Sequence, residues 1–166
     1  DTLKEKNPEF EYKIWDDNDI LNLSKKYYTD LEKIWDKLEG IQKADLGRYL
    51  ILYIEGGFYV DTDVMTLKPF SEFNLSKEIT YFAPSVQDHP FVNHKGITNY
   101  MIYNHIKGNN FFKKLLDESV KRISLNTYSK NSFQYVPNTT GKNLISILLV
   151  LVITGYGLSR KRLNLV

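Results

Sequence analysis

The hydrophobic and polar positions along the chain follow two different periodicities. Four segments carry apolar or aromatic side chains at the three- to four-residue spacing of a helix and are predicted helices: 20–38, 41–55, 99–106 and 110–123. The first is expected to divide into two helices near Thr29. Gly56 and Gly57 should end the second, because glycine accepts the left-handed conformation that a helix C-terminus requires. A new element is therefore expected from Phe58 onward.

Shorter apolar runs between these helices predict strands. They cover residues 11–15, 58–60, 80–83 and 132–136. Asp16–Asp19 is a turn-forming run after the first strand, and Val64–Leu67 should continue in extended form toward Pro69. Helices and strands that alternate along the chain favour an α/β fold. We expect a single domain over residues 1–166, or a fragment of a longer one.

Composition limits the classes of protein that this chain can be. With 166 residues, 42% of them hydrophobic and 14% aromatic, the chain can bury a core, which excludes intrinsic disorder. The absence of cysteine excludes disulfides, zinc–thiolate sites and thiol nucleophiles. The apolar run 144–153 is shorter than the roughly 20 residues of a membrane-spanning helix, so it predicts a buried helix or strand. The first ten residues are charged and carry no secretory signal, so we expect a cytoplasmic protein.

The charges are divided unevenly between the two halves of the chain. The whole chain has a net charge of +2, a poor basis for nucleic-acid binding, so no nucleic-acid partner is expected. Residues 1–80 hold 11 basic and 17 acidic side chains, whereas residues 81–166 hold 11 and 3. A basic half suggests an anionic acceptor or peripheral contact with a membrane surface, although lysines that are simply solvated would produce the same count.

The residues that carry chemistry lie in 44–64, a predicted helix, glycine turn and strand followed by two carboxylates. Asp45 and Arg48 are three residues apart and share one helix face. Asp61 and Asp63 flank one residue of an extended segment, so their side chains should point the same way. Paired carboxylates at the C-terminal edge of a mixed sheet suit Mg²⁺ or Mn²⁺, and an arginine adds a planar cation for phosphate or sugar hydroxyls. A solvated turn and a surface ion pair are the alternatives.

The order of residues in this segment is more informative than the Asp-x-Asp pattern alone. It contains an acidic residue, an Arg-Tyr pair, an apolar helix, a glycine pair, an aromatic strand and the two aspartates: Asp45, Arg48-Tyr49, Gly56-Gly57, Tyr59 and Asp61-Thr62-Asp63. This order resembles the DXD-motif glycosyltransferases related to initiation-specific mannosyltransferases, capsular polysaccharide glycosyltransferases and the glucosylating domains of large clostridial toxins. The resemblance extends upstream to residues 12–17 and downstream to Asn99 and the run 139–141.

The resemblance implies a GT-A-like nucleotide-diphospho-sugar transferase fold and a hexosyltransferase of the kind that serves polysaccharide biosynthesis. Such an enzyme moves a sugar from a nucleotide-diphosphate donor to a glycan or lipid-linked acceptor, with a retained anomeric configuration. By the same resemblance, Asp61 and Asp63 would hold Mn²⁺ or Mg²⁺, and Asp61 would also serve the donor's ribose and diphosphate. Asp45 and Arg48 would contact the transferred sugar, and Tyr59 would pack near the donor. The implied catalytic residues are therefore Asp45, Arg48, Asp61 and Asp63.

Two departures from the family's pattern bear on these expectations. No apolar strand precedes Asn7, where relatives carry the first nucleotide-binding strand, and Lys142 follows Gly141 where relatives have proline. The chain is therefore expected to be an N-terminally truncated form that lacks this strand. The missing strand leaves open a non-catalytic glycan- or nucleotide-binding module of the same fold. A dehalogenase-type phosphatase, which also has Asp-x-Asp after a strand, fits less well because Met65 replaces the Thr or Val that it requires.

Overall fold

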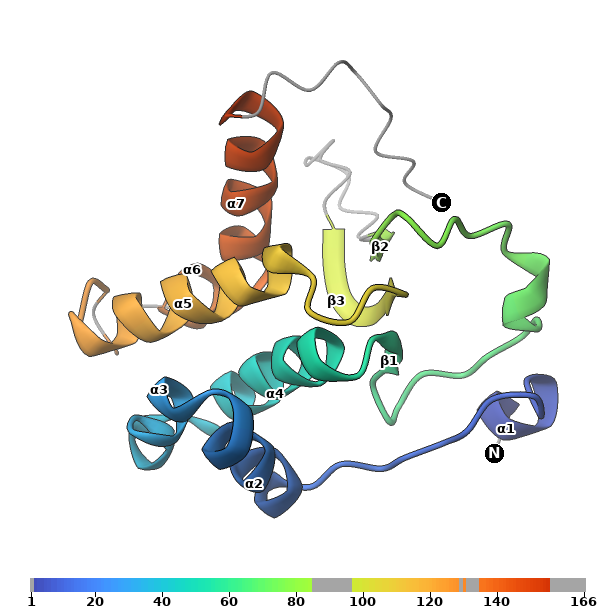
Figure 1. The fold of residues 1–166 in the computed structure, drawn as a ribbon, viewed down its shortest axis with the longest axis horizontal. Helices are drawn as coiled ribbons and strands as arrows, with labels where there is room; N and C mark the ends of the chain where they lie inside the picture. The colour runs from blue at the N-terminus through green and yellow to red at the C-terminus, as the bar shows by residue number, and fades with distance from the viewer. Residues whose placement is uncertain (1, 85–96, 129, 131–134, 156–166) are drawn as a thin grey trace, which may run out of the picture.

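The structure, a computed structural model, describes residues 2–84, 97–128, 130 and 135–155 (Figure 1). Its helices are α1 (Thr2–Lys6), α2 (Asp17–Tyr27), α3 (Thr29–Glu32), α4 (Gly40–Ile54), α5 (Asn110–Ser124), α6 (Tyr135–Thr139) and α7 (Lys142–Gly155). Two short 3-10 helices are η1 (Trp35–Lys37) and η2 (Phe70–Glu72), and the strands are β1 (Gly57–Val60), β2 (Tyr81–Pro84) and β3 (Ile97–Asn104). Helices α4 and α5 lie side by side, and the strands lie next to one end of this pair (Figure 1).

The three strands form one antiparallel sheet in the order β1-β3-β2. Gly57 lies opposite Asn104 and Val60 opposite Met101, so β3 pairs with β1 along the whole length of β1. The other edge of β1 has no strand partner among the described residues. A cavity of about 520 Å³ is lined there by β1 and by the extended segment 10–15.

Helix α4 is the centre of the core. Its N-terminus is closed by a capping box in which the Glu39 backbone N–H donates to the Gln42 side chain at 3.1 Å. Leu46, Leu50 and Leu52 are fully buried, because α2 and α5 pack against different sides of this helix. A helix buried on most of its faces leaves little freedom in its orientation, so the polar residues that it carries are held in defined positions.

Gly56 joins α4 to β1 at a close approach between two segments of backbone. Its φ is +69°, in the left-handed region, and a Cβ atom here would lie 3.0 Å from the carbonyl oxygen of Asn104. Gly57 follows with a φ of +86°. Two successive left-handed residues turn the chain directly from the helix into the strand, which brings the end of β1 near the middle of α4.

Several predicted elements are confirmed. The segment 20–38 divides near Thr29 into α2, α3 and η1, and α4 and α5 occupy the predicted ranges 41–55 and 110–123 to within a few residues. Strands β1 and β2 match 58–60 and 80–83, although β1 is half-buried rather than buried. The run 144–153 lies within helix α7, where Leu144 and Ile145 are fully buried. Over the described residues, no helix has the length and apolar character needed to span a membrane.

The helix predicted over 99–106 is wrong, because residues 99–104 belong to strand β3. The segment 97–104 is rich in Ile, Thr and Tyr, which favour strands, and β3 hydrogen-bonds with a neighbour on each side. Ladders on both sides satisfy its backbone, and a helix at this place would leave β1 and β2 without a common partner. The described sheet is also antiparallel rather than mixed.

Predictions at the N-terminal side of the core need correction as well. Residues 11–15 form no strand, because no described strand pairs with them, and Ile14 is 78% exposed. Asp16–Asp19 is not a turn: Asp16 caps α2 by accepting the backbone N–H of Asp19 at 2.8 Å, so the acidic run begins a helix. Val64–Leu67 forms neither helix nor strand, and its extended form stays a prediction.

The strand predicted over 132–136 lies partly outside the described residues. Tyr135 and Val136, which are described, begin helix α6. Pro137 is tolerated there because the first turn of a helix has no intrahelical acceptor for its missing N–H. The prediction is therefore wrong for the two residues that the structure describes.

Candidate active site

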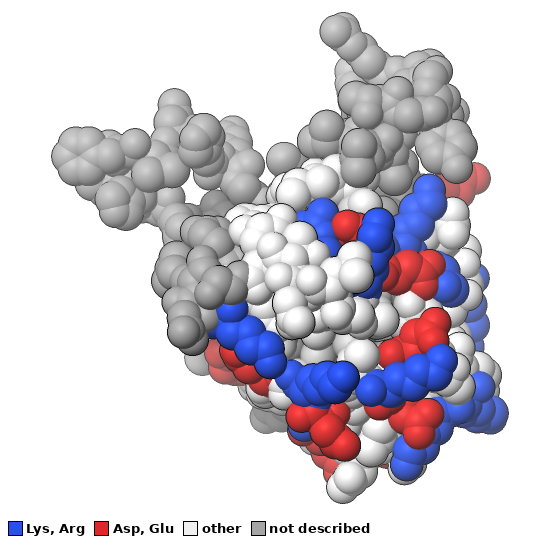
Figure 2. All heavy atoms as spheres, turned by 90° about the vertical axis from the view of Figure 1, so that its left-hand side faces the viewer, with Lys and Arg blue, Asp and Glu red and all other residues white. Residues whose placement is uncertain are grey.

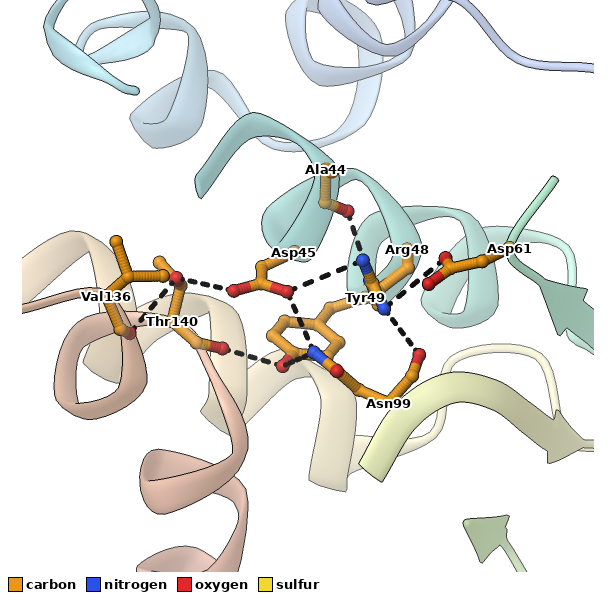
Figure 3. A network of polar contacts seen from close by, with 8 residues as sticks. All are labelled: Ala44, Asp45, Arg48, Tyr49, Asp61, Asn99, Val136 and Thr140. Atoms are coloured by element: carbon orange, nitrogen blue, oxygen red, sulfur yellow. Dashed lines mark hydrogen bonds and ion pairs between the residues drawn. The ribbon is translucent and has the colours of Figure 1, made fainter. Parts of the chain in front are cut away.

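Arg48 lies at the centre of a polar network between α4, β1 and β3 (Figure 3). Its Nη1 donates to the backbone carbonyl of Asn99 at 2.5 Å, and its Nε donates to the carbonyl of Ala44 at 3.3 Å. Nη2 lies 3.5 Å from Asp45 Oδ1, and Nη1 lies 3.5 Å from Asp61 Oδ1. The guanidinium therefore links the middle of the buried helix to the residue that follows β1.

Asp45 is almost completely enclosed, with 4% of its surface exposed. Its Oδ1 accepts Nδ2–H of Asn99 and its Oδ2 accepts the hydroxyl of Thr140, each at 2.8 Å. Burial raises the pKa of Asp45, because desolvation penalises the charged carboxylate, while Arg48 and the two hydrogen bonds act in the opposite direction. The sequence separation of these partners shows that three distant segments meet at one carboxyl group.

Tyr59 and Asp61 close the network on the strand side. Asp61 continues the pairing of β1 by donating its backbone N–H to the Tyr100 carbonyl at 2.8 Å, and its side chain is 29% exposed. The Arg48 guanidinium lies 5.0 Å from the centre of the Tyr59 ring, within the range of a cation–π contact. Burial raises the pKa of Tyr59 to about 12, against a lowering effect of Arg48 and with the Asp61 carboxylate adding to the rise.

The backbone around the Asp pair differs from the sequence expectation. Residues 61–64 form a turn in which Val64 N–H donates to the Asp61 carbonyl at 3.1 Å, so the extended backbone expected through Asp63 is not formed. Asp63 lies in this turn and is exposed. Asp61 sits at the end of the strand as expected, but Asp63 owes its position to the turn rather than to strand alternation.

The Asp pair fits a divalent cation that a substrate would help to bind. Asp61 and Asp63 offer carboxylate oxygens that are partly or fully exposed. Within the described residues, no group of three or more His, Cys, Asp or Glu side chains could enclose a metal ion. Mg²⁺ and Mn²⁺ commonly bind through one or two carboxylates and take their other ligands from water and substrate phosphates, so two aspartates are a sufficient protein contribution.

The structure brings four of the five predicted site residues together. Arg48 contacts Asp45, Tyr59 and Asp61, and the surface alternative for Asp45 and Arg48 is wrong, because their side chains are only 6% and 7% exposed. Asp63 lies outside this group, exposed in the turn two residues after Asp61. The roles of these residues in catalysis and binding stay predictions.

Three residues of the network had no predicted role: Tyr49, Asn99 and Thr140. Asn99 and Thr140 were noted only as distant parts of the family resemblance, and Tyr49 only as part of its central motif. The Tyr49 hydroxyl is buried and donates to the Thr140 carbonyl at 2.6 Å. The bonds of Asn99 and Thr140 to Asp45 could not be read from the sequence, because these residues lie 54 and 95 positions away from Asp45.

Comparison with known proteins supports the family resemblance. The family described as "glycosyltransferase sugar-binding region containing DXD motif" matches residues 1–82. This range ends within β2 and contains Asp45, Arg48 and Asp61 of the network. About half of the chain thus matches the DXD-motif glycosyltransferase family. The resemblance inferred from Asp45 through Asp63 is thereby confirmed.

The relatives of this DXD-motif chain include two fungal mannosyltransferases. It is 34% identical over 82 residues to the initiation-specific alpha-1,6-mannosyltransferase of Candida albicans, covering 47% of this chain and 21% of the relative. It is 28% identical over 110 residues to inositol phosphoceramide mannosyltransferase 1 of Schizosaccharomyces pombe, covering 58% of this chain and 34% of the relative. The chain thus spans about a third or less of the length of these relatives.

The fold is shared with a solved glycosyltransferase. The PaToxG glycosyltransferase superposes with a TM-score of 0.53 and 24% identity, over 80% of this chain and 41% of that chain. The expected α/β, GT-A-like fold is confirmed in this partial form.

Proposed function

We propose that this chain is part of a hexosyltransferase that moves a sugar from a nucleotide-diphosphate donor to a hydroxyl group of a glycan or lipid-linked acceptor. The observation that supports this most directly is the buried Asp45–Arg48 pair next to Asp61, the residue that follows β1. A buried ion pair is a weak source of stability, so its presence next to the partly exposed carboxylate of Asp61 favours a role in a site. The mannosyltransferase relatives support the same reaction class.

Each residue of the network supplies a chemically distinct group. Arg48 carries a permanent charge on a planar fork, which suits phosphate oxygens or vicinal sugar hydroxyls. Asp45 would accept hydrogen bonds from hydroxyls of the transferred sugar, and Tyr59 would offer its ring to the donor. Asp61 lies next to Arg48 and would contact the donor's ribose and diphosphate. We propose that the anomeric configuration is retained, as the family resemblance implies.

Asp61 and Asp63 are the residues that would hold a divalent cation. When bound, Mn²⁺ or Mg²⁺ would stabilise the negative charge that develops on the departing diphosphate. Arg48 adds a fixed positive charge on the same side of β1, held in place by its bonds to Asn99 and Asp61. The protein's contribution is therefore charge that is oriented before the substrate arrives.

The basic half of the chain supports a further proposal, that the protein is cytoplasmic and works at the periphery of an anionic surface that presents its acceptor. Ion pairs on α5 neutralise part of the basic charge: Lys113 pairs with Asp117 at 2.5 Å, and Arg122 pairs with Glu118 at 2.8 Å. Figure 2 shows Lys and Arg interspersed with Asp and Glu on the face that it presents. Charges of both signs reduce the attraction that the net charge alone would predict.

A screen of sugar nucleotides in the presence and absence of Mn²⁺ tests the proposed function. We expect one or more donors to raise the thermal stability of the full chain only with Mn²⁺, and slow Mn²⁺-dependent hydrolysis of the same donor. Asp61→Asn should abolish both effects. Asp36→Asn is the matched control, since Asp36 is exposed on η1, away from the network, and undergoes the same change of charge.

The result also separates the enzyme from the alternative. Donor binding without hydrolysis or transfer would favour the non-catalytic binding module. If no donor changes the thermal stability of the protein, either with or without Mn²⁺, the proposed function is wrong for this chain.

A further inference from the structure

The turn between α6 and α7 is fastened to α4 by two threonines that make different contacts. Thr140 donates its hydroxyl to Asp45 Oδ2 at 2.8 Å, and its carbonyl accepts the Tyr49 hydroxyl at 2.6 Å. Thr139 donates its hydroxyl to the Tyr135 carbonyl at 2.7 Å and accepts Nε2–H of Gln42 at 3.0 Å. Both threonines are fully buried. One of them therefore touches the candidate site, and the other only anchors the turn.

The backbone of this turn is built to hold Thr140 in one position. The N–H groups of Thr140 and Gly141 both donate to the Val136 carbonyl at 3.0 Å, which closes the C-terminus of α6. A Cβ atom on Gly141 would lie 3.0 Å from the Cα of Pro137, so the glycine permits the tight return of the chain. A hydroxyl held by a closed turn presents a fixed donor, in contrast to one on a loose loop.

Asn99 bonds to the other oxygen of the Asp45 carboxylate. The Asn99 side chain donates to Asp45 Oδ1 at 2.8 Å, while its backbone carbonyl accepts Arg48 Nη1 at 2.5 Å. With Asn99 on one oxygen and Thr140 on the other, rotation of the Asp45 carboxylate would break at least one hydrogen bond (Figure 3). The orientation of Asp45 in turn sets the acceptor that faces Arg48 Nη2 at 3.5 Å.

We propose that Thr140 is a positioning residue that fixes the Asp45–Arg48 pair for binding of the donor's sugar, which couples the α6–α7 turn to the candidate site. This inference rests on the proposed function for the identity of the ligand. Its structural content, that the Thr140 hydroxyl orients Asp45 and through it Arg48, does not depend on any ligand. Thr140 itself is not expected to touch the substrate, since its hydroxyl is already engaged by Asp45.

Three variants of the full chain separate positioning from general stability. Thr140→Val removes the hydroxyl that contacts Asp45 and keeps the branched shape, and Thr140→Ser restores the hydroxyl. Thr139→Val is the matched control, because it removes a buried hydroxyl of the adjacent residue that bonds to Gln42 rather than to Asp45. Both valine variants leave one buried polar partner unsatisfied, so both should lower thermal stability.

The first measurement uses the protein without ligand. In NMR spectra, we expect the side-chain carboxyl ¹³C signal of Asp45 and the Nε–H signal of Arg48 to shift or broaden in Thr140→Val. They should stay at their wild-type positions in Thr140→Ser and Thr139→Val. Unchanged Asp45 and Arg48 signals in Thr140→Val would overturn the proposal. Should this variant fail to fold, Thr140→Ala takes its place, because it also removes the hydroxyl that contacts Asp45.

The second measurement is the affinity for the donor found in the sugar-nucleotide screen, with Mn²⁺ present. We expect Thr140→Val to weaken binding by about tenfold, the size of one lost hydrogen-bonding arrangement, and Thr140→Ser and Thr139→Val to stay within about twofold of wild type. Equal weakening in Thr139→Val would show that only stability matters and would contradict the proposal. NMR effects confined to Thr140→Val in a protein that binds no donor would uphold positioning while refuting the proposed function.

Discussion

At the scale of single residues, the site depends on how the hydrogen-bonding groups of Arg48 and Asp45 find partners although both side chains are buried. Arg48 reaches the Ala44 and Asn99 carbonyls and the carboxylates of Asp45 and Asp61, so most of its donors have acceptors. Asp45 in turn receives hydrogen bonds at both oxygens. Removing one partner of such a buried pair lowers the free energy of unfolding by more than the intact pair contributes, because the remaining group is left charged and unpaired.

Asp45→Asn is expected to change how stability depends on pH. Burial raises the pKa of Asp45 above 3.8, so the folded protein binds a proton at this carboxyl more readily than the unfolded chain does. The stability that this group contributes is fully present below its unfolded pKa and is lost as the pH rises through the raised folded pKa. In metal-free urea denaturation, the stability of wild type relative to Asp45→Asn should therefore fall with rising pH, starting near 3.8.

The amide can keep the local geometry needed for this comparison. Its oxygen can accept from Asn99, and its NH₂ group can donate to Thr140 Oγ1, whose hydroxyl also lies 3.5 Å from the Val136 carbonyl. A relative stability that rises with pH over the same window would mean that the hydrogen bonds and Arg48 outweigh desolvation, and the direction of the shift would be wrong.

At the scale of elements, the junction between α4 and β1 decides where the functional residues meet. Arg48 lies near the middle of α4, Asp61 follows β1, and the only connection between the two elements is the stretch Glu55–Gly56. A longer or differently directed connection would move the end of β1 away from the buried helix. The pairing of β1 with β3 fixes the other side, since Asp61 N–H bonds to Tyr100 on that strand.

Gly56→Ala should destabilise the chain and also weaken the site. The methyl group would meet the Asn104 carbonyl at 3.0 Å, and a φ of +69° is strained for alanine, so we expect a loss of about 1–3 kcal/mol in the free energy of unfolding. Chemical denaturation measures this loss. We also expect weaker Mn²⁺-dependent donor binding, because a shifted β1 would carry Asp61 away from Arg48.

Gly40→Ala provides the comparison for this prediction. Gly40 begins α4, a Cβ atom there would meet nothing within 4 Å, and no left-handed φ is recorded for it. The free energy of unfolding should stay constant or rise by up to about 1 kcal/mol, since alanine reduces the freedom of the unfolded chain. Equal losses in the two variants would show that the junction has no special role.

At the scale of the whole molecule, packing around α4 joins parts of the chain that carry opposite net charge. The acidic N-terminal half supplies α4 and β1, and the basic half supplies α5 and β3, which pack against α4 and β1 respectively. Side chains of α5 show that the basic excess is partly neutralised where it is described, through Lys113–Asp117 and Arg122–Glu118.

Sedimentation with liposomes across a salt series tests contact with an anionic surface. We expect vesicles with anionic lipid to retain more of the full chain than neutral vesicles at low salt, and the difference to disappear at high salt, since each exposed lysine contributes about 1 kcal/mol near such a surface. Lys142→Glu, which reverses an exposed cation, should reduce retention. Equal retention by both kinds of vesicle would refute the membrane proposal.

The local sequence was sufficient for the features that depend on neighbouring residues. The periodicity of 41–55, the glycines at 56 and 57 and the order of residues from Asp45 to Asp63 predicted a helix, its end, a strand and a carboxylate pair. The helix, its end and the strand are confirmed in position, because helix periodicity and glycine conformation act over fewer than about twenty residues. Asp61 follows the strand as expected, but Asp63 lies in a turn. The same local information also indicated the family.

Only the tertiary structure decided features that depend on distant partners. Residues 99–104 are a strand because β1 and β2 both pair with them, and residues 11–15 are not a strand because no described strand pairs with them. The burial of Asp45 and its bonds to Asn99 and Thr140 join positions 54 and 95 residues apart. Strand pairing and the satisfaction of a buried carboxylate are properties of the packed chain, and no local pattern specifies which distant segment will supply the partner.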